Sequence, residues 1–167
     1  MRLINTDAIP LSDFNGYWLK AWTGDGHWFR VLLYVTKEEF VEAAKRAGVT
    51  GPLEGKNGAA ALTSWMKRRN KYKSRLKNKR QLGQILFCLE TITGDLIAHE
   101  CFHAAMIWWR QVAAAHGRRR FSREQEEQIA VVVQLLFHQI SGAHKAVAED
   151  LRNERQPKDS SSRKDQS

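Results

Sequence analysis

The sequence predicts an α+β fold in which a small, mostly antiparallel sheet packs on two long helices. Two β-patterned runs joined by a glycine-rich turn indicate a hairpin, and a third apolar run at 84–90 indicates another strand. Two later segments each combine helix-capping residues with a long apolar stripe. The chain has 167 residues, 43% of them hydrophobic, which is enough for one domain with a buried core.

The N-terminal part of the chain is predicted to form the hairpin. Residues 17–22 and 27–35 are rich in aromatic and branched side chains, as strands are. The sequence Thr-Gly-Asp-Gly at 23–26 lies between them and is typical of a tight turn. We therefore expect these two runs to pair as antiparallel neighbours.

A short helix is expected after the hairpin. Thr36 can cap its start, Glu39 completes a capping box, and Gly48 stands where the helix should end. Residues 59–80 are also predicted to be helical, with a basic end. The apolar run 84–90 is then the third strand of the sheet.

The first long helix is predicted over 95–116. Thr93 or Asp95 can cap its start, and Gly117 stands where a left-handed residue commonly ends a helix. No Pro or Gly interrupts the segment, and apolar side chains recur through it: Leu96, Ile97, Phe102, Ala105, Met106 and Val112. This pattern favours a helix that packs on a core.

The second long helix is predicted to begin at Ser122. Ser122 and Gln125 form a capping-box pattern, glutamates at 124, 126 and 127 fill the first turns, and an apolar run extends to Ile140. From Arg152 onward the chain becomes charged and rich in Ser. We expect one domain over 1–153 with a basic insert at 67–80, followed by a disordered tail over 154–167.

The first long helix carries the pattern H-E-x-x-H, from His99 to His103. Residues four apart share one helix face, so both imidazoles can point at one metal ion. Zinc lowers the pKa of a bound water to about 7, and a carboxylate beside the site can take its proton. The pattern therefore predicts Zn²⁺ as cofactor, Glu100 as general base, and hydrolysis of a protein or peptide substrate.

The two histidines have an alternative interpretation as ordinary core residues. Buried imidazoles would then need hydrogen-bond partners, which an apolar helix supplies poorly. Cys101 lies inside the motif but is offset by about 200° from both histidines. We expect Cys101 to face the core, and Cys88 with Cys101 does not form the disulfide framework of a secreted protein.

A catalytic zinc needs a third protein ligand. A third His six residues beyond the second is excluded, because Met106 and Trp109 occupy the positions where that pattern needs Gly and His. A Glu on the second helix is the other common choice. Helical geometry ranks Glu127 first, because it shares a face with the small Ala130, and Glu126 second, whereas Glu124 better suits compensation of the helix dipole.

The run 97–105 together with Glu127-Gln128-Ile129-Ala130 resembles the Glu-liganded branch of the zincin superfamily. It is similar to small phage and prophage proteins described as metallopeptidases and, more loosely, to the ImmA/IrrE peptidases. In the latter the third ligand lies in a Glu-x-x-Ala pattern, which implies Glu127 here. The resemblance covers residues 83–140 and implies a zincin-type zinc site with metallopeptidase activity.

The chain also departs from that family. Many zincin peptidases stabilise the oxyanion with a downstream His or Tyr, but no Tyr follows the motif here. His138 lies eleven residues beyond Glu127, or roughly 16 Å along a straight helix. An oxyanion donor would therefore have to come from the N-terminal half or from backbone N–H groups.

The net charge of +9 is concentrated in one acid-free stretch, and the remaining 18 basic residues equal the 18 acidic ones. Such a block favours an anionic partner, either nucleic acid or an acidic protein surface. An alternative function is thus a zincin-like binding or effector protein that keeps a structural or vestigial metal site. Its polyanion-binding residues would be Lys67, Arg68, Arg69, Lys71, Lys73, Arg75, Lys77, Lys79 and Arg80.

The sequence contains no apolar run long enough to span a bilayer. Residues 1–10 also lack the basic start and apolar core of a signal peptide. We therefore expect a cytoplasmic protein without a membrane partner.

Overall fold

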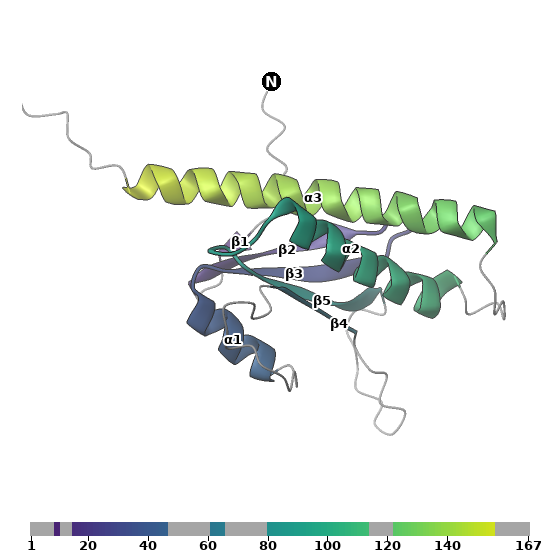
Figure 1. Cartoon of the computed structure of the whole chain (residues 1–167), viewed down its shortest axis with the longest axis horizontal. Helices are drawn as coiled ribbons and strands as arrows, with labels where there is room; N and C mark the ends of the chain where they lie inside the picture. Colours follow the sequence, from purple (N-terminus) through teal and green to yellow (C-terminus); the bar gives the residue numbers. More distant parts are fainter. Residues whose placement is uncertain (1–8, 11–14, 47–60, 66–79, 114–121, 156–167) are drawn as a thin grey trace, which may run out of the picture.

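The computed structural model describes residues 9–10, 15–46, 61–65, 80–113 and 122–155 (Figure 1). The elements of these ranges are, in chain order, β1 (Ile9–Pro10), β2 (Gly16–Trp22), β3 (Trp28–Tyr34), α1 (Lys37–Arg46), β4 (Ala61–Trp65), β5 (Gln81–Cys88), α2 (Gly94–Trp108), the π-helical turn η1 (Trp109–Ala113) and α3 (Arg123–Arg155).

The strands form one sheet in the order β1-β2-β3-β5-β4. β2 and β3 are the predicted hairpin, with Trp22 opposite Trp28 at the turn. Only the β3–β5 pair of this described sheet is parallel, and the other three neighbouring pairs are antiparallel. The predicted α+β class is therefore confirmed, and the sheet is mixed with mostly antiparallel pairs.

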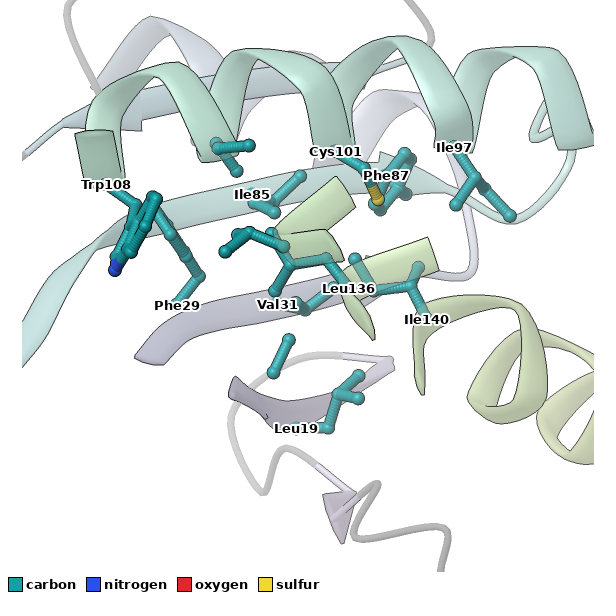
Figure 2. Packing of buried hydrophobic residues seen from close by; sticks show 14 of the residues in the cluster. Leu19, Phe29, Val31, Ile85, Phe87, Ile97, Cys101, Trp108, Leu136 and Ile140 are labelled. Atoms are coloured by element: carbon teal, nitrogen blue, oxygen red, sulfur yellow. The ribbon is translucent and has the colours of Figure 1, made fainter. Parts of the chain in front are cut away.

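Helices cover both faces of the sheet. Alternate residues of a strand point to opposite faces, so Phe87 packs beneath α2 and α3 whereas its neighbour Leu86 packs against Phe40 of α1. Figure 2 shows the larger core, in which Cys101 of α2 and Leu136 of α3 meet side chains of β3 and β5. The two long helices thus share one layer, with α1 on the opposite side of the sheet (Figure 1).

α3 is also tied to the end of β2 by a side-chain amide. Gln139 accepts the backbone N–H of Trp22 at 2.9 Å through Oε1 and donates to the Trp22 carbonyl at 2.9 Å through Nε2. The amide therefore pairs with the last residue of β2 as a neighbouring strand would. This contact fixes the position of α3 along the sheet.

One expected element and two expected boundaries are wrong. A helix was expected over 59–80, but residues 61–65 form strand β4. Pairing with β5 satisfies their backbone groups at the edge of the sheet. The rest of 59–80, apart from Arg80, lies outside the described residues. The third strand runs over 81–88 rather than 84–90. α3 continues to Arg155 and so includes Glu154, the expected first residue of the tail.

The helix expected over 95–116 is α-helical only to Trp108. The N–H of Trp109 is shared between the carbonyls of Ala105 and Met106, and the chain then widens into the π-helical turn. Such turns place an extra residue in the helix and redirect the side chains beyond it. Residues 114–121, with the expected end at Gly117, lie outside the described residues.

Candidate metal centre

α2 is held in register by the cap that the sequence predicts. The Oγ1 of Thr93 accepts the N–H of Leu96 at 3.3 Å, and the Thr93 carbonyl accepts the N–H of Ile97 at 3.0 Å. The first of these bonds satisfies an orphan donor of the first turn, and the second is the first hydrogen bond of the regular helical series. His99 therefore lies on a well-formed helix, less than two turns after its start.

His99 and His103 lie together on the exposed face of α2. Their Nε2 atoms are 3.0 Å apart, and the ring centroids are separated by 4.6 Å with the ring planes at 84°. Neither imidazole is a core residue, so the alternative interpretation as buried histidines is wrong. The shared helix face that the sequence predicts is confirmed.

The spacing of the two nitrogens suits a single zinc ion. Two Zn–N bonds of about 2.05 Å at a tetrahedral angle place their nitrogens about 3.3 Å apart. The observed 3.0 Å differs from that value by only a small side-chain rotation. The 3.0 Å contact is a hydrogen bond between the two rings, and the same pair could supply two of the ligands of a zinc ion.

Glu100 is 6% exposed and lies about 100° around the helix from His99. It is thus shielded from bulk water, while the histidine beside it is open to solvent. Cys101 is fully buried, as predicted from its offset. Burial and the nearby Glu100 carboxylate raise the pKa of the Cys101 thiol to about 12, so this thiol is protonated at neutral pH and faces the core.

No group of three His, Cys, Asp or Glu side chains arranged to hold a metal occurs among the described residues. Glu127 is exposed, and its Oε1 atom lies 3.6 Å from Nε of Arg123. Glu126 lines a groove between α2 and α3, and Glu124 is exposed. The two helices run antiparallel (Figure 1), so all three glutamates lie toward the C-terminal end of α2.

The groove beside the histidines is open and apolar. Its volume is about 710 Å³, and Phe102 on its wall is 50% exposed. Phe102 also directly precedes His103, with ring centroids 6.3 Å apart, so His103 is next to one residue of the groove wall, although neither histidine lines the groove. The residues that line it are Ala98, Phe102, Met106, Glu126, Ile129, Ala130, Val133, Gln134 and Phe137.

A polar cluster at the hairpin turn was missed by the sequence analysis. Oδ2 of Asp25 accepts the indole N–H of Trp108 at 2.9 Å and lies 3.0 Å from Nδ1 of His27. Oδ1 accepts the Thr23 hydroxyl at 2.6 Å and the backbone N–H of His27 at 3.2 Å. Partial burial alone would raise the pKa of Asp25, but bonds from Thr23, Trp108 and His27 outweigh it and lower the pKa to about 2.

This cluster predicts a stability that depends on pH. The folded pKa of Asp25 is below the unfolded value of about 3.9, so the carboxylate stabilises the fold above about pH 4, and this contribution is lost as pH falls toward 2. Asp25→Asn should lower the free energy of unfolding at pH 7 by about 1–2 kcal/mol, after discounting for partial exposure. Urea titrations between pH 2 and 7 measure this, with the exposed Glu42→Gln as control. If the free energies of unfolding of parent and variant differ as much at pH 2 as at pH 7, the stabilising role of the Asp25 carboxylate is contradicted.

The basic residues Lys67, Arg68, Arg69, Lys71, Lys73, Arg75, Lys77 and Lys79 lie outside the described residues. Arg80 is described and exposed, and its carbonyl accepts the N–H of Trp28 at 3.0 Å. The predicted polyanion surface therefore stays a prediction.

Comparisons of the chain with protein-family models, with curated proteins and with solved structures find no match. Within the part of the chain that the structure describes, no helix combines the length and apolar character needed to cross a membrane. Any proposal for function therefore depends on the geometry of the residues themselves.

Proposed function

We propose that this protein is a zinc-dependent hydrolase, and specifically a peptidase, in which His99 and His103 hold the metal. The observation that supports this most is the approach of their Nε2 atoms to 3.0 Å on an exposed helix face. Two imidazoles at this separation present lone pairs to one point that solvent and substrate can reach. The same separation allows a hydrogen bond between the two neutral rings, and zinc would take the place of that contact.

Zinc bound here would supply a Lewis acid that makes water acidic enough to lose a proton near neutral pH. Glu100 follows His99 directly and is shielded from bulk water. A carboxylate in this position suits a general base that accepts a proton and passes it to the leaving amine. The groove walled by Phe102 would hold an apolar side chain of the peptide beside the histidines.

The proposal predicts one zinc ion per chain that depends on both histidines. His99→Ala or His103→Ala should abolish stoichiometric zinc, because a single remaining imidazole binds the ion too weakly to survive dialysis. Elemental analysis of the dialysed proteins measures the zinc content. The matched control is His138→Ala, an exposed histidine on α3 that should leave the metal content unchanged. Equal zinc in the parent and both α2 variants would refute the site.

The α3 ligand can be identified with the same measurement. The sequence and the family resemblance favour Glu127, whereas the groove contains Glu126, which makes Glu126 the carboxylate that faces α2. Glu126→Gln and Glu127→Gln should therefore be compared by zinc titration, with Glu124→Gln as control. A loss of zinc affinity confined to one variant identifies the ligand, and unchanged affinity in both excludes an α3 carboxylate.

A second candidate function is a binding protein with a non-catalytic metal. One observation favours it: the described residues supply only two converging ligands. Such a protein would bind zinc through the same histidine pair, but its function would not depend on Glu100. Replacement of Glu100 therefore distinguishes the two candidates.

A further inference from the structure

A second pocket, which shares no lining residue with the groove or the histidine pair, lies against the last turns of α3. Its volume is about 300 Å³. Val35 and Leu89 line one side, and these residues directly follow the parallel strands β3 and β5. Crevices at the carboxyl ends of parallel strands are common ligand sites in α/β sheets. The opposite wall belongs to α3, through His144, Ala148, Leu151, Arg152 and Arg155.

The α3 wall is one helix face. His144, Ala148, Arg152 and Arg155 succeed one another at intervals of four, four and three residues, which is the spacing of side chains on one side of a helix. Ala148 is the smallest of them and leaves room between the histidine and the arginines. The face therefore combines a cationic end with a small apolar centre.

Two of the three acidic residues of the same turns, Asp150 and Glu154, lie on another side of the helix. Burial raises the pKa of Tyr17 on β2, and the charges of Glu154 and Asp150 raise it further, which places both carboxylates toward Tyr17. Glu149 lies about 100° from Ala148 and about 60° from Arg152, beside the face that lines the pocket. No acidic residue lines the pocket among the described residues, so Arg152 and Arg155 give its lining a positive charge.

Recognition in this pocket depends on side chains. The backbone N–H of Val35 already donates to Asn15 at 3.0 Å, and that of Leu89 donates to Tyr34 at 2.8 Å. Burial and the charge of Lys145 lower the pKa of His144, so its ring is neutral at pH 7 and serves as a hydrogen-bond partner. Arg152 and Arg155 supply the positive charge, while Val35 and Leu89 supply an apolar wall.

We propose that this pocket binds a small carboxylate that carries an apolar chain, with the carboxylate on Arg152 and Arg155 and the chain against Val35, Leu89 and Ala148. Guanidinium groups pair with carboxylates through two parallel hydrogen bonds. A hydrocarbon chain that covers the apolar wall removes apolar surface from water, which favours binding. This site is independent of the metal centre and of the proposed hydrolase activity.

Isothermal titration of the full chain with octanoate tests the proposal. Octanoate should bind at one site, while 1-octanol, which lacks the charge, and acetate, which lacks the chain, should each bind at least about tenfold more weakly, as expected when a charged hydrogen-bonded pair or the apolar contact is lost. Octyl phosphate distinguishes the head groups. Tighter binding of octyl phosphate than of octanoate would overturn the carboxylate assignment, and no octanoate binding would overturn the site.

Two variants locate the binding. Arg152→Gln with Arg155→Gln should weaken octanoate about tenfold or more through loss of the charged pairs. Ala148→Phe should block the pocket by filling its centre. Arg123→Gln, at the other end of α3, is the matched control and should bind as the parent does. Octanoate affinity that is unchanged in both pocket variants would show that it binds elsewhere, and folding is checked by circular dichroism.

Discussion

Replacing Glu100 by Gln should lower peptide hydrolysis by about 10²–10⁴-fold while leaving the zinc content unchanged. Gln has nearly the size of Glu and keeps an acceptor oxygen, but its amide cannot take a proton from water. Glu100 is 6% exposed, so its replacement changes a shielded position, and thermal unfolding must show that the variant folds. The measurement is cleavage of a proteome-derived peptide library by zinc-loaded parent and variant proteins.

The control for this experiment is Glu42→Gln, an exposed change on α1, which packs on the opposite face of the sheet. It should cleave the library as the parent does. Equal cleavage by the parent and Glu100→Gln would contradict the general-base role. A zinc-loaded parent that cleaves nothing would instead favour the binding-protein candidate, because zinc binding through His99 and His103 would remain without hydrolysis.

Leu136→Ala should lower the free energy of unfolding by about 2–5 kcal/mol. Leu136 is 0% exposed and lies where α3 packs on the sheet, close to Val31 and Ile140 (Figure 2). Its truncation removes apolar contacts and leaves a cavity that neighbouring elements cannot close fully. Urea unfolding followed by circular dichroism measures the change.

The adjacent Leu135→Ala is a matched control with the same chemistry. Leu135 is 39% exposed, so its truncation should cost less than about 1 kcal/mol. The difference between the two variants tests which face of α3 contacts the core. Similar losses for both would show that the helix is rotated relative to the sheet.

Local signals in the sequence predict much of this fold. The cap at Thr93 and the reciprocal capping box of Ser122 and Gln125 form as expected, with Ser122 N–H to Gln125 Oε1 at 2.9 Å and Gln125 N–H to Ser122 Oγ at 3.3 Å. Such bonds join residues three apart, so their geometry depends little on the rest of the chain. For the same reason the i, i+4 spacing of His99 and His103 was sufficient to place both imidazoles together.

β4 shows where local signals are insufficient. Its residues, 61–65, belong to a segment that the sequence predicts to be helical, and little in their own composition prevents a helix. Pairing with β5 satisfies one row of their backbone groups and places them at the sheet edge. Strand preference depends on neighbours to a much greater extent than helix preference does.

The sequence by itself determined the α+β class, the hairpin, the two long helices and the histidine pair, because each depends on residues close together in the chain. Only the tertiary structure decided that Glu126 rather than Glu127 lines the groove, and that Asp25 bonds Trp108, 83 residues away. Those outcomes depend on how α3 rotates against α2 and where the hairpin turn meets the end of α2. The packing of elements that are distant in the chain fixes the rotation of α3 and the position of the hairpin turn. The periodicity of a single segment does not predict that packing.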